Sequence, residues 1–67
     1  MTDAKMVLMA NQIAAFFATQ PGGDQAAGVA AHLKDFWEPR MLTQLKAYLG
    51  KGGEGLNDLV IEAGKTL

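Results

Sequence analysis

Two helices are predicted to meet in the stretch His32-Leu33-Lys34-Asp35-Phe36-Trp37-Glu38-Pro39-Arg40-Met41. Pro39 disfavours the α conformation at Glu38 and so ends the helix before it. Pro39 also suits the first position of the next helix, where its missing N–H is not needed. The stretch holds the only Trp, the only His and the only Arg of the chain, which makes it a candidate contact surface as well as a corner.

Apolar residues recur every three or four positions on both sides of this corner, which is typical of helices buried along one stripe. The stripes are Met6, Met9, Ala10, Ile13, Phe16, Phe17, then Ala26, Val29, Ala30, Leu33, Phe36, Trp37, then Met41, Leu42, Leu45, Tyr48, Leu49. We expect helices over about 3–19, 24–37, 39–49 and 57–66.

Capping and turn residues separate the predicted helices. Thr2 or Asp3 can cap the first helix and Asp24 the second, because their side chains accept bonds from free backbone N–H groups. Pro21-Gly22-Gly23 ends the first helix, since proline cannot continue it and glycine tolerates the exit. Gly28 costs about 1 kcal/mol relative to Ala inside a helix, so we expect a tight helix crossing there.

Near the C-terminus, the run from Gly50 to Gly55 predicts a flexible link. Asn57 can cap a short last helix, for which Leu56 and Ile61 are spaced as a hydrophobic staple. No segment alternates like a strand. The sequence therefore predicts an all-α fold: a single domain built as a small three-helix bundle with a short fourth C-terminal helix.

Length and composition exclude several ways of stabilising this domain. A chain of 67 residues buries only roughly 60% of its unfolded surface. It contains no Cys, which excludes disulfides and thiolate metal sites. Such small domains often rely on a partner. We therefore expect a protein partner, or a homodimer when the chain is isolated.

Charge and hydropathy exclude further classes. The net charge is −1 and the lysines are scattered singly, unlike the basic stripe of nucleic-acid binders. No apolar run has the eighteen or more residues of a membrane span. Lys5 and the apolar residues after it resemble a signal peptide briefly, but Asn11-Gln12 interrupts them. We expect a cytoplasmic protein that binds neither nucleic acid nor membrane.

The corner offers few candidates for chemistry. His32 could act as a general base or pair with Asp35 on one helix face, but a surface or interface histidine explains it equally well. Phe36 and Trp37 point about 100° apart on a helix, so one of them should be exposed or fill a partner pocket. Arg40 either pairs with a carboxylate of its own chain or holds its planar fork toward a partner.

Three motifs resemble the small delta subunit of bacterial cytoplasmic NAD-dependent formate dehydrogenases. They are the Met-Ala-Asn-Gln-Ile of Met9 to Ile13, the His32 to Met41 stretch, and the Gly-Gly-x-Gly-Leu of Gly52 to Leu56 followed by Leu59-Val60. The resemblance covers nearly the whole chain. The chain departs from it at Asp58, where members often carry a proline.

The resemblance implies a non-catalytic accessory subunit. Its partners would be the catalytic and diaphorase subunits, which would carry a molybdenum or tungsten bis-pterin centre, iron–sulfur clusters, FMN and NAD. This chain would carry no cofactor and no metal, and would support assembly, maturation or stability of the complex. The competing reading is a free-standing helical interaction module or a homodimeric maturation chaperone.

We expect no catalytic, cofactor-binding or metal-binding residue in this chain. Partner binding is expected at the corner and at two polar residues of the first helix. These residues are His32, Phe36, Trp37, Pro39, Arg40, Met41, Asn11 and Gln12.

Overall fold

Four helices and no strand make up the computed structural model, which describes residues 1–67. The helices are α1 (Asp3–Ala18), α2 (Gln25–Phe36), α3 (Pro39–Gly50) and α4 (Asp58–Gly64). The predicted all-α class is confirmed, and each observed end lies within two residues of the expected one.

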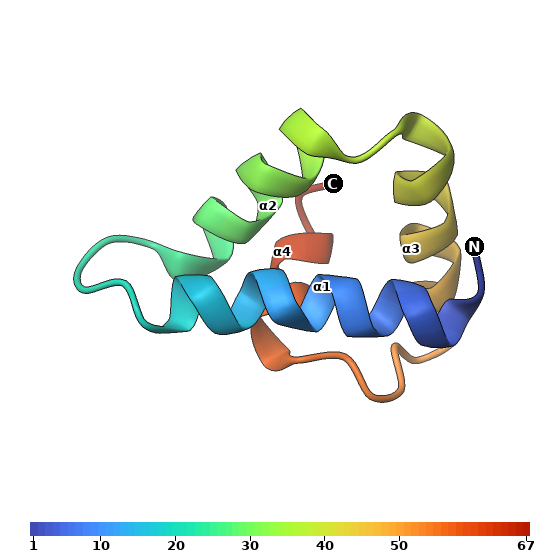
Figure 1. Cartoon of the computed structure of the whole chain (residues 1–67), viewed down its shortest axis with the longest axis horizontal. Coiled ribbons are helices and arrows are strands. Elements are labelled where there is room, and N and C mark those ends of the chain that lie inside the picture. Colours follow the sequence, from blue (N-terminus) through green and yellow to red (C-terminus); the bar gives the residue numbers. More distant parts are fainter.

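Helix α1 is the base on which the other helices are arranged (Figure 1). Helices α2 and α3 rise from its two ends on the same side, and α4 lies between them. Both α1 and α4 pack against all three other helices. Because α2 and α3 are far apart at α1 and approach each other only at the corner that joins them, α4 fits between them (Figure 1).

The core consists of apolar side chains from every helix and from two of the connections. Its buried members are Met6, Ala10, Ala14, Val29, Ala30, Leu33, Trp37, Leu45, Leu56, Val60 and Ala63. Many of them are small, so the helices approach one another closely. Helix α3 buries only Leu45 completely, because α1 and α4 cover it from one side only.

Two residues of the predicted apolar stripes are exposed to solvent. Phe16 is 58% exposed and Phe36 is 73% exposed. In α1 the buried residues are Met6, Ala10 and Ala14. Phe16 lies two positions after Ala14, about 200° around the helix, and so faces away from the core. The expectation that Phe16 faces the core is therefore wrong, whereas the exposed Phe36 and the buried Trp37 fit the expectation that one of these two neighbours is exposed.

The predicted helix boundaries have a local physical cause. The side chains of Thr2, Asp24 and Asn57 each accept a bond from a backbone N–H in the first turn, at 3.2, 3.1 and 2.9 Å. Helix α3 begins differently: Glu38 makes no capping bond through its side chain, and Pro39 occupies the first turn. Because proline lacks an N–H, α3 begins with one fewer free donor.

Gly28 lies at the expected tight crossing between α1 and α2. A Cβ atom added to Gly28 would lie 2.8 Å from Cδ1 and Cε1 of Phe17. Real Cβ atoms essentially never come so close to a neighbour. The absence of a side chain at Gly28 thus lets the Phe17 ring pack directly against α2.

Asn11 fastens the loop before α4 onto α1. Its Nδ2 donates to the carbonyl oxygen of Gly55 at 2.9 Å, and its Oδ1 accepts from the backbone N–H of Asn57 at 2.7 Å. Gly55 has φ +83°, a left-handed conformation that favours glycine. Tyr48 Oη also donates to the carbonyl oxygen of Glu54, at 2.6 Å. The expected flexible link is thus held at several points.

Replacing Asn11 with alanine should destabilise the fold. Asn11→Ala removes both bonds to the loop and leaves a half-buried backbone N–H at Asn57 without its partner, which should cost about 1–3 kcal/mol. For a domain of this size the melting temperature should fall by roughly 4–8 °C per kcal/mol. The control is Gln12→Ala at the exposed neighbouring position, which should change the stability by less than about 0.5 kcal/mol. Equal melting temperatures for the two variants would show that the loop is held without Asn11.

Candidate partner-binding surface

An apolar groove of about 410 Å³ lies between α1 and the C-terminal half of α2. We call it the aromatic groove. Its lining residues are Met9, Gln12, Ile13, Phe16, Phe17, His32, Phe36 and Trp37. The first five come from α1 and His32 and Phe36 from α2, so each helix forms one wall. Trp37, which caps the C-terminal end of α2, is only 7% exposed and belongs to the core.

Four aromatic rings follow one another along this surface. His32 and Phe36 lie with their ring centroids 4.6 Å apart and their planes tilted by 35°. Phe17 approaches His32 edge-on at 6.1 Å, and Phe16 meets Phe17 edge-on at 5.2 Å. Edge-to-face pairs of this kind are attractive beyond the area they bury. The contacts between the rings therefore stabilise their arrangement, although Phe16 and Phe36, at the two ends of the row, are largely exposed.

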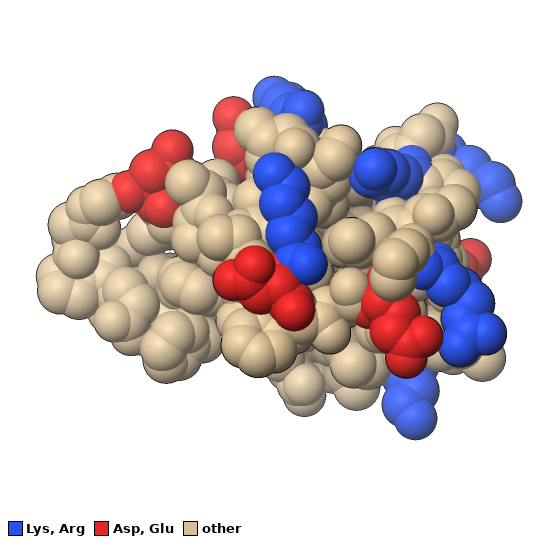
Figure 2. Space-filling model, turned by 90° about the horizontal axis from the view of Figure 1, so that it is seen from above, with Lys and Arg blue, Asp and Glu red and all other residues tan.

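Charge distinguishes the aromatic groove from the rest of the surface. None of its lining residues is Asp, Glu, Lys or Arg. On the face seen from above, Lys and Arg side chains alternate with Asp and Glu over the central and right-hand parts (Figure 2). That face has no stripe of a single sign.

The structure brings four of the eight predicted partner-binding residues together. Gln12, His32, Phe36 and Trp37 all line the aromatic groove. Asn11 does not, since both ends of its amide are bonded to the loop before α4. The structure thus gives Asn11 a role within the fold.

The remaining three predicted residues lie in the first turn of α3. Arg40 and Met41 line a separate hollow of about 360 Å³, and Pro39 is exposed beside it. Arg40 Nη2 lies 3.4 Å from Oε2 of Glu38, and 86% of the Arg40 side chain is exposed. An ion pair as exposed as this one contributes little to stability. The guanidinium is therefore accessible for other contacts.

Sequence reasoning missed four residues of the aromatic groove. Met9, Ile13, Phe16 and Phe17 were assigned to the core as one stripe, yet they form one wall of the groove. The sequence feature that could have revealed them is the adjacent aromatic pair Phe16-Phe17, which is constrained in the same way as the pair Phe36-Trp37. Two neighbouring aromatic residues on a helix cannot both face one interior.

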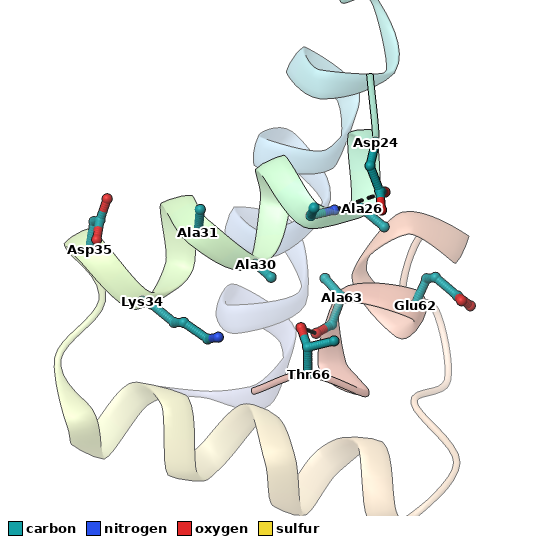
Figure 3. A pocket seen from close by; sticks show the side chains of 10 residues that line it. Asp24, Ala26, Ala30, Ala31, Lys34, Asp35, Glu62, Ala63 and Thr66 are labelled. Atoms are coloured by element: carbon teal, nitrogen blue, oxygen red, sulfur yellow. Dashed lines mark hydrogen bonds between the residues drawn. The ribbon is translucent and has the colours of Figure 1, made fainter. Parts of the chain in front are cut away.

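A wider hollow of about 480 Å³ lies between α2 and α4 (Figure 3). Alanines of α2 and Ala63 of α4 form much of its wall, and Lys34 extends toward it from α2. Thr66 Oγ donates to the carbonyl oxygen of Ala63 at 3.0 Å. Asp24 already caps α2. The hollow therefore combines small apolar side chains with polar groups that stabilise the helix ends.

The side chains present do not fit a bound metal or cluster. The chain has no Cys to ligate an iron–sulfur cluster. No three residues of the types His, Cys, Asp and Glu lie close enough together to hold a metal ion. None of the four helices has the length and apolar character needed to span a bilayer.

Comparison with known proteins identifies one family. The family model of the NADH-dependent formate dehydrogenase delta subunit FdsD matches residues 5–63 of the 67. The matched region includes every residue of the aromatic groove and the Asn11 contact with the loop. The comparison with curated proteins found no match.

Truncation of the adjacent aromatic residues Phe36 and Trp37 should destabilise the fold to very different extents. Trp37→Ala removes a buried side chain and should cost about 3–5 kcal/mol, which is enough to unfold much of so small a domain. Phe36→Ala removes an exposed ring that stacks on His32 and should cost less than about 1 kcal/mol. Thermal melts followed by far-UV circular dichroism measure both. A Phe36→Ala variant that melts as early as Trp37→Ala would show that Phe36 is a core residue.

Proposed function

This chain belongs to the FdsD family of NADH-dependent formate dehydrogenase delta subunits, and from that membership we propose that it is a non-catalytic accessory subunit. It binds the catalytic and diaphorase subunits of the enzyme in the cytoplasm. Through this binding it supports the assembly, maturation or stability of the complex.

The aromatic groove is the observation that carries this proposal. Phe16 and Phe36 are both more than half exposed, and they flank the groove on opposite walls. Exposed apolar surface of this kind marks interaction sites in soluble proteins. Aromatic side chains are also enriched where partners bind most strongly. Covering the groove with another subunit would remove this surface from water.

The redox groups of the reaction belong to the other subunits in this proposal. A molybdenum or tungsten bis-pterin centre, iron–sulfur clusters, FMN and NAD supply the chemistry of formate oxidation there. The delta chain has no thiolate to hold such a cluster. Its contribution is the contact itself.

The alternative is a free-standing interaction module or a homodimeric maturation chaperone that leaves before the enzyme works. The observation that favours this alternative is the exposure of Phe36 to water in the isolated chain. Size-exclusion chromatography of the active enzyme, with its subunits identified, separates the two functions. A permanent subunit elutes with the activity, whereas a chaperone is absent from the active fractions.

Arg40→Ala should weaken the association with the other subunits and leave the fold unchanged. The only ion pair of Arg40 within the chain is the exposed contact with Glu38, so the melting temperature should stay constant. If Arg40 meets a carboxylate of another subunit, its loss should cost about 2–5 kcal/mol of binding. Pull-down affinity and melting temperature are measured on the same variant. Lys46→Ala, at an exposed position of α3, is the control. Unchanged affinity would place the interface away from the α3 turn.

His32→Gln should leave turnover intact. A general acid or base contributes about 10²–10⁴-fold to a rate, so a catalytic His32 would be recognised at once. We expect formate-dependent NADH production, normalised to bound metal, to stay within about threefold of the parent complex. The yield of assembled complex can fall, because His32 lines the aromatic groove. A hundredfold loss at full metal loading would contradict the non-catalytic assignment.

A further inference from the structure

We propose that the aromatic groove receives an uncharged, apolar face of an α-helix from another formate dehydrogenase subunit. This inference rests on the proposed function and adds to it the surface and the kind of segment that binds there. Three properties of the groove support it. Its lining has no charged residue, its walls are helices that bond their backbone internally, and its length along α1 is limited.

The absence of charge in the lining decides the polarity of the occupant. An Asp, Glu, Lys or Arg buried in the groove would lose its water without meeting an opposite charge. The groove offers only two strongly polar side chains, Gln12 on the α1 wall and His32 on the α2 wall. These can bind one or two uncharged polar groups. The remaining contacts of the occupant must be apolar.

The backbone of the walls decides the conformation of the occupant. Both walls are α-helices, which bond most of their backbone N–H and C=O groups internally and leave a few carbonyl groups free only at their C-terminal ends. The chain has no strand edge to which an extended segment could add. An extended occupant would therefore bury its own backbone groups without partners, which is costly. A helix satisfies its backbone within itself and presents only side chains.

The dimensions of the groove limit how much of the helix can enter. Along α1 it extends from Met9 to Phe17, which is about 12 Å at the rise of an α-helix. This length matches little more than two helical turns. The occupant thus contributes two or three apolar side chains at spacings of three or four residues. Phe16 and Phe36 would cover them from the two sides.

A second copy of this chain is a poor occupant. Apart from Phe16 and Phe36, the large apolar side chains that the chain exposes are those of Met1 and Leu8. These do not form a helical stripe that could enter the groove of another copy. The helix therefore comes from a different chain.

Adding a charge at Gln12 tests the proposal. Gln12 is exposed on α1, and both Glu and Lys are good helix formers, so Gln12→Glu and Gln12→Lys should fold normally. Each variant should weaken binding to the other subunits by about tenfold or more, whichever sign it carries, because either charge is buried without a partner. The controls are Ala47→Glu and Ala47→Lys at an exposed position of α3, which should bind as the parent does. The readout is pull-down affinity with the assembled partner subunits. Weakening by only one sign of charge, or by neither, would overturn the proposal.

Photo-crosslinking identifies the occupant. A benzophenone-bearing amino acid at position 36 should crosslink, within the complex, to a segment of another subunit with apolar residues three or four apart. The same group at Lys46 on α3 is the control and should not reach that segment. A crosslink to a second copy of this chain, or to a charged segment, would overturn the inference. A chain that co-purifies with the enzyme but is unaffected at Gln12 would refute the groove and leave the proposed function standing. A chain that does not co-purify would refute both.

Discussion

The burial of Trp37 is the constraint on which the rest of the structure depends. Its indole belongs to the core and fixes the C-terminal end of α2 at the corner that Pro39 creates. Because neighbouring residues point about 100° apart on a helix, burying Trp37 turns Phe36 outward. Phe36 then lies beside His32 and forms the outer edge of one groove wall. The burial of Trp37 in the core thus also places Phe36 at the edge of the aromatic groove.

The sequence was sufficient to predict the helices and their boundaries, because those features are local. Pro39, Asp24 and Asn57 act within one turn of their own positions, and the structure shows them at the helix starts that they predict. The Gly28 crossing was also predictable, since a glycine inside a helix is costly unless something packs against it.

The surface was less predictable, because it depends on which side of each helix another helix covers. Phe16 and Phe17 fit the same apolar stripe, and only the position of α2 decides that Phe17 packs and Phe16 is exposed. Asn11 looked like a surface residue because its partners, Gly55 and Asn57, are more than forty positions away in the sequence. Contacts over such a separation leave no periodic signal in the chain.

The central position of α4 has a consequence for biosynthesis. It is synthesised after α1, α2 and α3, yet it packs against all three of them. Val60 and Ala63 complete the core, and Asn11 meets its backbone partners only when Asn57 has been made. While the chain is being translated, the first three helices therefore lack the element that closes their interior. Only when α4 has been made can the interior close and Asn11 hold the loop before it.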